Sequence, residues 1–106
     1  MNKTKQKKRL KRLTYHLIIN ERIKTSPQAA KKVKSYAEKL ITRAKNDNHK
    51  NRKYVKSKLP KEAVRKLFND IGPANKNREG GYTRIMRLGH RQGDGSQRCI
   101  LEIIDV

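Results

Sequence analysis

Apolar residues at helical spacing mark the first part of the chain. Leu10, Leu13 and Leu17 are separated by three and four residues, so they fall on one face of a helix over residues 9–19. Residues 21–25 then alternate in character, which predicts a short strand or an extended link.

The best-defined helix of the sequence begins at Ser26-Pro27. Serine caps the free amides of a first helical turn, and proline at the first helical position loses no hydrogen bond. One face of this helix is apolar and the remainder is basic. The apolar face has Ala29, Val33, Ala37, Leu40 and Ala44 near its centre, with Ala30, Tyr36 and Ile41 at its edges. We expect the helix to fray over residues 46–48.

Two further helical segments follow. Residues 49–59 are strongly basic and have a weak helical pattern. Pro60 begins the next helix, whose apolar residues have the spacing of one buried stripe: Val64, Leu67, Phe68 and Ile71. Gly72-Pro73 is expected to end this helix, because glycine suits a helix C-cap and proline cannot continue a helix.

The last part of the chain predicts two strands. Residues 82–88 alternate in polarity, and residues 98–106 are rich in isoleucine, which suggests burial on both faces. A glycine-containing turn over residues 89–97 makes the two strands antiparallel neighbours. Strands and helices would enclose a thin core whose expected members are Val33, Leu40, Val64, Leu67, Phe68, Ile85, Leu101 and Ile103.

The charge of the chain is large and uneven. Its 29 Lys and Arg against 9 Asp and Glu give a formal net charge of +20, of which residues 1–66 carry +19 and residues 67–106 carry +1. Such asymmetry indicates a polyanionic partner, either nucleic acid or an anionic membrane. Residues 1–8 have no apolar periodicity, so we expect a basic, disordered arm there and a single domain over residues 9–106.

Several protein classes are disfavoured. The longest apolar runs have three residues, so no segment is expected to span a bilayer, and the N-terminus lacks the apolar core of a signal peptide. The single cysteine, Cys99, permits neither a disulfide framework nor a cysteine zinc cluster within the chain. Membrane-surface binding ranks below nucleic acid, because tryptophan is absent and the helix after Ser26 has mostly alanine on its apolar face.

A catalytic centre is not expected. The three histidines lie in different predicted elements, and no acid–base pair is visible, so a small nuclease is the least favoured hypothesis. Cys99 is expected to pack in the sheet as a small apolar residue. Gly93-x-Gly95 indicates a turn, since no Gly-Lys-Ser/Thr sequence follows it. We therefore predict no enzymatic activity, no cofactor, no metal and no small-molecule substrate.

Clusters of bases without acids are the main functional signal. Residues 1–20 contain seven bases and no acid, and residues 50–61 contain six bases and no acid. Such density releases counterions on binding a phosphate backbone. A third patch is expected where the strand and turn meet at residues 84–91. The predicted RNA-binding residues are Lys3, Lys5, Lys7, Lys8, Arg9, Lys11, Arg12, Lys31, Lys32, Lys34, Arg43, Lys45, Lys50, Arg52, Lys53, Lys56, Lys58, Arg84, Arg87, His90 and Arg91.

Three tyrosines are interleaved with the basic clusters. Tyr36 is expected to pack at the edge of its helix. For Tyr15 and Tyr54, packing and stacking on an unpaired base are equal alternatives. Charge alone does not distinguish DNA from RNA, and no two predicted helices are joined by the three- or four-residue turn of a helix-turn-helix.

A specific motif lies in the C-terminal part of the chain. The string Gly80-Gly81-Tyr82-Thr83-Arg84-Ile85 is followed by Arg87-Leu88-Gly89 and by Arg91-x-Gly93-Asp94. Upstream, in the same order as in one known family, are Glu21-Arg22-Ile23-x-Thr25, Glu38-Lys39-Leu40-Ile41-Thr42-x-Ala44-Lys45 and Lys66-Leu67-Phe68. With these motifs, residues 11–106 resemble the bacterial-type large-subunit ribosomal protein L17 family.

The resemblance implies an α+β fold with three to four helices packed on a short, mixed three-stranded sheet, in which residues 23–25 form the third strand. It also implies a structural constituent of the large ribosomal subunit, in the cytoplasm or in an organelle. Such a protein binds and stabilises large-subunit rRNA through Lys and Arg contacts to phosphate. The expected partners are this rRNA and neighbouring large-subunit proteins, with no homo-oligomer. A free nucleoid or RNA-chaperone protein is the alternative.

Overall fold

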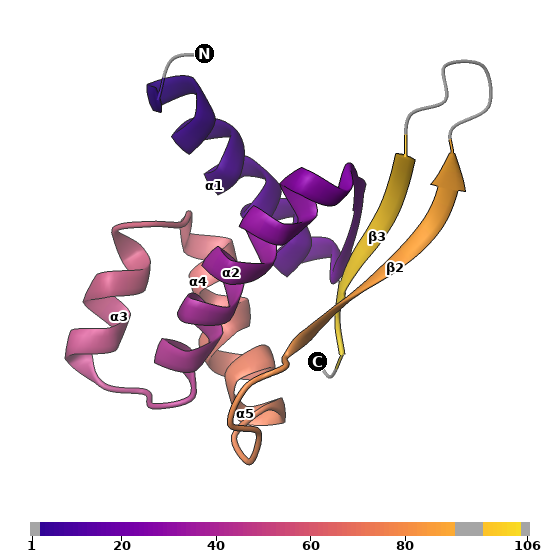
Figure 1. The fold of residues 1–106 in the computed structure, drawn as a ribbon. Coiled ribbons are helices and arrows are strands. Elements are labelled where there is room, and N and C mark those ends of the chain that lie inside the picture. The colour runs from indigo at the N-terminus through magenta and orange to yellow at the C-terminus, as the bar shows by residue number, and fades with distance from the viewer. Residues whose placement is uncertain (1–2, 91–96, 105–106) are drawn as a thin grey trace.

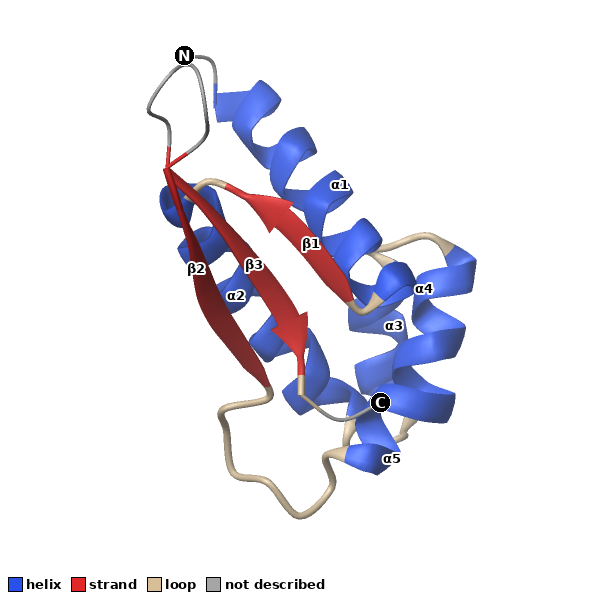
Figure 2. Cartoon of the chain, turned by 90° about the vertical axis from the view of Figure 1, so that its right-hand side faces the viewer, coloured by secondary structure: helices blue, strands red, loops and turns tan. Residues whose placement is uncertain are grey.

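The computed structural model describes residues 3–90 and 97–104 of the chain, and within them helices lie against one face of a sheet. The elements in chain order are α1 (Lys3–Asn20), β1 (Arg22–Thr25), α2 (Pro27–Ala44), α3 (His49–Lys56), α4 (Lys61–Lys66), a π-helical turn (Leu67–Ile71), α5 (Gly72–Ala74), β2 (Thr83–His90) and β3 (Gln97–Ile103). Helices α1 and α2 pack on the sheet, and α3, α4 and α5 pack beyond them (Figures 1 and 2). The α+β class expected from the sequence is confirmed.

The sheet has the strand order β1-β3-β2, and β3 runs antiparallel to both of its neighbours. The third strand over residues 23–25 is therefore confirmed, but the expectation of a mixed sheet is wrong. The reason is the position of β3: it lies between β1 and β2 and separates the two strands that share a direction. The amide of Ile103 also donates to the carbonyl of Glu21 at 2.9 Å, which ties the start of β1 to the end of β3.

Helix α1 begins six residues earlier than the sequence pattern predicted. Residues 3–8 are helical, so the expectation of a disordered arm does not hold for them, and residues 1–2 lie outside the described residues. Lysine and glutamine are good helix formers, and no turn or capping signal separates residues 3–8 from the predicted helix. Leu17 and Ile18 are fully buried, while Leu10 and Leu13 are only half-buried. The first half of α1 therefore has little packing beneath it.

Helix α2 is the centre of the molecule. The Ser26 Oγ accepts a hydrogen bond from the amide of Ala29 at 3.3 Å, so the predicted cap is confirmed. The buried face is wider than expected, because Ala30 and Ile41, which the pattern placed at the edges, are both completely buried. Contacts with α1, with the sheet and with the helices that follow cover more than one side of α2.

The expected helix end at Gly72-Pro73 is wrong. After α4 the chain continues through the π-helical turn into α5, and Gly72 has an ordinary right-handed helical conformation (φ −57°). A Cβ at residue 72 would lie 2.4 Å from the carbonyl oxygen of Ala44. Glycine is thus required here for close packing against the end of α2. The predicted helix over residues 49–59 is confirmed for residues 49–56, which form α3, capped by Asn48; residues 57–59 form a turn.

One hydrophobic cluster connects the helices to the inner face of the sheet. Of the eight expected core residues, all are buried except Ile85, which is only partly buried. Cys99 is completely buried, as predicted, and its thiol donates to the carbonyl of Thr25 at 3.4 Å. The predicted burial of β3 on both faces holds only in part, since Ile100 on the outer face remains half-buried.

Candidate nucleic-acid interface

Most of the predicted basic residues fall into two groups according to what surrounds them; Lys58, whose ammonium lies 5.6 Å from the centre of the Tyr54 ring, and Arg87 belong to neither. The first group, which we call the solvent-facing cations, is exposed and forms no hydrogen bond or ion pair through its side chains within the described residues. Its members are Lys5, Lys7, Lys8, Arg9, Lys11, Arg12, Lys31, Lys32, Lys50, Lys53 and Lys56. The side chains of Lys3 and His90, and the whole of Arg91, lie outside what the structure describes.

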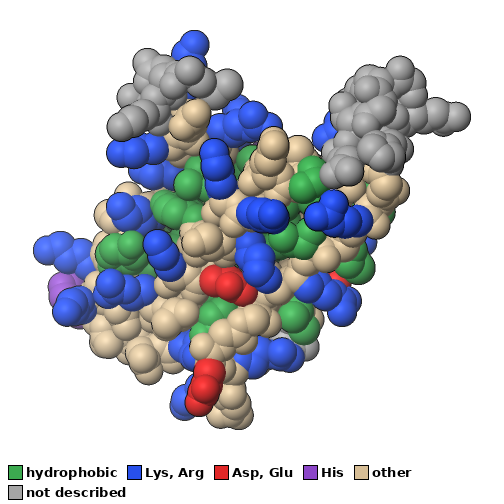
Figure 3. Space-filling view, viewed as in Figure 1, with side chains coloured by type: hydrophobic (Ala, Val, Ile, Leu, Met, Phe, Trp, Pro, Cys, Tyr) green, Lys and Arg blue, Asp and Glu red, His purple; other side chains and the backbone are tan. Residues whose placement is uncertain are grey.

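Helix α1 forms the ridge of this surface. Its first turns extend past the start of α2, and Figure 3 shows Lys and Arg side chains gathered over α1, the start of α2 and α3, while acidic side chains lie lower on the same face. Helical geometry distributes the cations of residues 5–12 around the ridge. Residues 1–20 contain no acid, so no carboxylate of this segment offsets their charge. Repulsion among these cations would be relieved by a bound polyanion.

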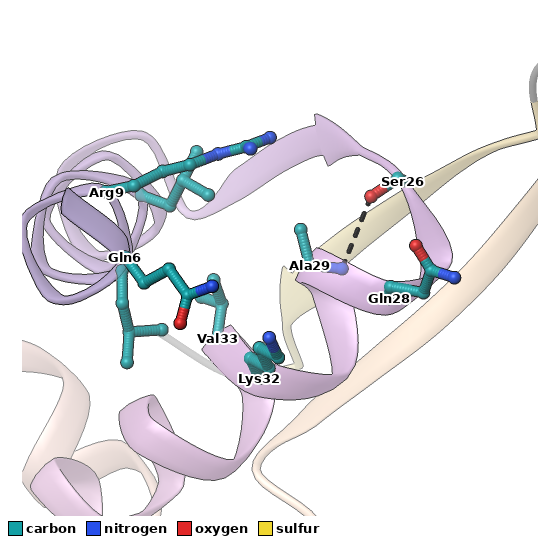
Figure 4. Close-up of a pocket in the computed structure, with 9 residues that line it drawn as sticks. Gln6, Arg9, Ser26, Gln28, Ala29, Lys32 and Val33 are labelled. Atoms are coloured by element: carbon teal, nitrogen blue, oxygen red, sulfur yellow. Dashed lines mark hydrogen bonds between the residues drawn. The ribbon is translucent and has the colours of Figure 1, made fainter. Parts of the chain in front are cut away.

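A groove lies on one side of the ridge, between α1 and the first turns of α2. This α1–α2 groove has a volume of about 240 Å³ and an apolar floor that includes Leu10, Leu13 and Val33. Figure 4 shows Arg9 reaching over it from α1 and Lys32 placed at the other side on α2, with Gln6 between the two helices. Phosphate oxygens near the mouth could therefore meet a cation from either helix.

A second groove lies between α1 and the turn that joins α3 to α4. This α1–α3 groove has a volume of about 460 Å³ and takes Lys11, Arg12 and Tyr15 from α1. The opposite wall is formed by residues 56–60, which include Lys56 and Lys58. The two basic clusters of the sequence, at residues 3–12 and 50–58, thus come together across one groove.

The second group of predicted basic residues, the internally bonded cations, serves the fold: Lys34, Arg43, Lys45, Arg52 and Arg84. The ammonium of Lys34 donates to the carbonyl of Thr83 at 2.9 Å and lies 3.8 Å from Glu38. The ammonium of Lys45 donates to the Tyr82 hydroxyl at 2.8 Å and to the carbonyl of Arg78. These two lysines fasten β2 and the loop before it to α2.

Lys45 also changes the acidity of Tyr82. Burial by itself raises the pKa of the Tyr82 hydroxyl, but the hydrogen bonds from Lys45 and Thr42, together with the nearby ammonium charge, lower the pKa below its ordinary value. The same ammonium lies 5.0 Å from the centre of the Tyr82 ring. Lys45 is therefore engaged by both the ring and the hydroxyl of one buried residue.

Two arginines connect α2, α3 and the loop between these helices. The guanidinium of Arg43 lies 4.4 Å from the centre of the Tyr54 ring and donates to the Asn51 side chain at 3.4 Å. Arg52 makes a two-pronged contact with Asp47, one bond of which is 2.7 Å, and this hydrogen bonding lowers the pKa of the Asp47 carboxyl. Contacts within the protein therefore fix the positions of Arg43 and Arg52 without any bound ligand.

The strand patch is organised around one buried acid. Glu102 on β3 accepts hydrogen bonds from Arg84 on β2 and from Arg22 on β1, the latter at 3.2 Å. The carboxylate side chain is 9% exposed, whereas the side chains of Arg22 and Arg84 are 64% and 59% exposed. The two arginines brace the outer face of the sheet. Arg87 is exposed farther along β2.

Comparison with known proteins decides the family. Residues 9–104 match the family described as ribosomal protein L17. The chain belongs to this family. A large ribosomal subunit protein bL17 of Natranaerobius thermophilus is 44% identical over 105 residues, which cover 98% of this chain and 93% of the relative.

Two other large ribosomal subunit proteins bL17 are also similar to the chain. The protein of an Exiguobacterium species is 43% identical over 107 residues, covering 95% of this chain and 92% of its own length. The protein of Treponema denticola is 49% identical over 86 residues, covering 80% of this chain but only 48% of its own length. The chain thus spans about half of one relative and nearly the whole of two others.

This member of the L17 family has further exposed cations that the sequence-based prediction omitted. Lys61 follows Pro60 at the α1–α3 groove, and Lys24, Lys39 and Lys76 lie on β1, on α2 and in the loop after α5. The signal for Lys24 and Lys39 was available, because each occupies a polar position opposite the buried face of its element. Of these four lysines, Lys61 alone is next in sequence to a residue that lines a groove.

The described part of this L17-family chain shows no cluster of metal-binding side chains. No group of three or more His, Cys, Asp or Glu side chains gathers among the described residues. Burial raises the pKa of the Cys99 thiol, which disfavours the reactive thiolate. Among the described helices none is long and apolar enough to cross a membrane.

Proposed function

We propose that this chain is a structural component of the large ribosomal subunit that binds and stabilises large-subunit rRNA. Family membership supports the place of action, since the relatives named above are large ribosomal subunit proteins. The observation that carries the RNA-binding role is the set of solvent-facing cations on α1, on the start of α2 and on α3, which have no protein partner among the described residues.

Phosphate contacts are the chemistry that this surface supports best. Each lysine or arginine that neutralises a phosphate releases condensed counterions, so binding weakens steeply as salt rises. A polyanion would also relieve the repulsion among charges that total +20 in this chain. The protein would therefore act by positioning RNA segments relative to one another in the cytoplasm, with neighbouring subunit proteins around it.

Sedimentation of a cell lysate tests the proposal directly. A tagged full-length chain is expected to move with the large subunit at moderate salt and to leave it when the salt is raised. Recovery mainly in slow-sedimenting fractions at moderate salt would overturn the ribosomal role.

Binding measurements on the purified chain separate the ribosomal role from general nucleic-acid binding. We expect a large-subunit rRNA preparation to retain the chain in a salt titration after a generic DNA duplex of equal phosphate content has released it. Equal salt sensitivity for the two ligands would instead favour a free nucleoid or RNA-chaperone protein.

A further inference from the structure

The four tyrosines of the chain have different surroundings, and only one of them lines a groove of the candidate interface. Tyr82 is buried, and Tyr36 is packed against the core with a buried hydroxyl. The ring of Tyr54 has the guanidinium of Arg43 4.4 Å from its centre. Tyr15 is half-buried on α1, where it packs partly against the core like Tyr36, but it also lines the α1–α3 groove.

The walls of this groove combine cations with an apolar base. Lys11 and Arg12 are contributed by α1, and Lys56 and Lys58 are contributed by the end of α3 and the turn after it. Leu59, only 6% exposed, and Pro60 provide the apolar part. One acid is nearby: the hydroxyl of Tyr15 contacts the exposed carboxylate of Glu62 at 3.5 Å. At this distance the contact is weak.

We propose that the α1–α3 groove binds an unpaired nucleotide of the RNA, with its base stacked on Tyr15 and its flanking phosphates held by the cations on the two walls. This inference rests on the proposed function and specifies which form of RNA the groove takes. Aromatic rings flanked by cations are the usual platform for single-stranded RNA, whose bases are free to leave the stack.

Duplex RNA fits the groove less well. In an A-form helix the bases are stacked on one another and its phosphates line the outside, so a duplex would meet the ridge of α1 and not the recessed ring. An acidic peptide would satisfy the cations but would leave Tyr15 and Leu59 without an aromatic partner. Both alternatives are separate outcomes of the experiment below.

The experiment compares wild type with three variants on two RNA ligands. The ligands are an unstructured 12-nucleotide single strand and the 12-base-pair duplex of the same sequence, each with a fluorescent label. Tyr15→Leu removes the ring, Tyr15→Phe keeps the ring and removes the hydroxyl, and Tyr36→Leu makes the same change at a half-buried tyrosine outside both grooves.

Loss of one stacked base costs about 1–3 kcal/mol, which corresponds to about a 5- to 150-fold weaker affinity. We expect Tyr15→Leu to show a loss of this size for the single strand and less than twofold for the duplex. Tyr15→Phe and Tyr36→Leu should bind both ligands like wild type. Equal losses on both ligands, or a Tyr15→Phe loss as large as that of Tyr15→Leu, would overturn the proposal.

Photochemical crosslinking of wild type provides a test that does not depend on folding of a variant. A single strand containing 4-thiouridine should crosslink to Tyr15 or to residues 56–60, as mapped by mass spectrometry. Crosslinks confined to other parts of the chain would overturn the assignment. A polyglutamate peptide that displaces the single strand as well as polyuridylate does would favour an acidic protein partner instead. If wild type bound neither RNA, the proposed function itself would fail.

Discussion

Two regions of the molecule use the same residue types for different purposes. On α1, the start of α2 and α3, the solvent-facing cations have no protein partner among the described residues. The internally bonded cations lie from the middle of α2 to Arg52 on α3 and at Arg84 on the sheet, where they contact carboxylates, carbonyls and aromatic rings. The difference follows from the acids: residues 1–20 have none, whereas Glu38, Asp47 and Glu102 lie in or beside the second region.

This comparison shows that density of basic residues alone does not define the interface. Sixteen of the predicted binding residues belong to one of the two groups, and five of those sixteen are already bonded within the protein. Removing a solvent-facing cation should weaken RNA binding with little effect on folding. Removing an internally bonded cation should lower the stability of the fold with little direct effect on RNA binding.

The largest effect is expected from the ridge. Replacing Lys8, Lys11 and Arg12 together by Gln should weaken binding to large-subunit rRNA by roughly 10²-fold or more near 0.1 M salt, because each lost phosphate contact lowers the salt slope by about 0.7–0.9. Filter binding across a salt series measures both quantities. Thermal stability should stay the same or rise.

A matched triple variant separates position from net charge. Replacing Lys24, Lys39 and Lys76 by Gln removes the same charge from exposed residues that lie away from the two grooves. We expect the reduction in salt slope for this variant to be less than a third of the reduction for the Lys8, Lys11 and Arg12 variant. Equal losses from the two triples would mean that binding responds only to total charge, and the comparison between the regions would fail.

The next largest effect belongs to the internally bonded group. Lys45→Met leaves the carbonyl of Arg78 and the hydroxyl of Tyr82 without the Lys45 donor, which should cost about 1–3 kcal/mol of unfolding free energy. Lys39→Met, on the same helix but exposed, should change stability by less than about 0.5 kcal/mol. Urea titration gives both values. A Lys45→Met variant as stable as Lys39→Met would contradict the assignment of Lys45 to the fold.

A smaller effect is expected at the acid that braces the sheet. Glu102→Gln weakens the hydrogen bonds from Arg22 and Arg84 and should reduce stability by about 1–2 kcal/mol, since both guanidiniums are largely exposed to water. Glu79→Gln changes the net charge equally at an exposed loop residue and should leave stability unchanged. If the two variants have the same melting temperature, the Glu102 contacts do not stabilise the sheet.

The sequence predicted the elements well where local signals and packing agree. Ser26-Pro27, the Val64–Ile71 stripe and the pairing of the last two strands all follow from short-range rules, and the structure confirms them. The prediction at Gly72 was wrong because a glycine after a helical stripe suggests a helix C-cap. Its actual role is close packing against Ala44, which is distant in sequence. The strand order also depends on long-range pairing that no local pattern encodes.

The candidate site was predictable as a composition but not as a geometry. The clusters at residues 3–12 and 50–58 were visible in the sequence, yet nothing in it indicated that they meet across one groove. The bonds of Lys34 and Lys45 to β2 and its loop join residues 33 or more apart, so these lysines looked identical to their solvent-facing neighbours. Whether a base is bonded within the protein depends on the positions of the acids and carbonyls around it, and not on the base itself.

The smallest effect lies at Arg52, where the two groups meet. Its hydrogen bonds hold the pKa of Asp47 below the ordinary value, so the pair stabilises the fold above the unfolded-state pKa of Asp47 and loses that contribution as pH falls through the lowered folded-state pKa. The melting-temperature difference between wild type and Asp47→Asn should therefore be constant above about pH 5 and shrink below it.

The same substitution converts Arg52 from an internally bonded cation into one that faces solvent. Asp47→Asn should then raise rRNA affinity at low salt more than Asp70→Asn, which makes the same charge change at an exposed acid of the π-helical turn. Exposed ion pairs are weak, so the expected difference is about twofold. Equal gains from the two variants would show that Arg52 contacts RNA no better when its partner is removed, and that α3 binds through Lys50, Lys53 and Lys56 alone.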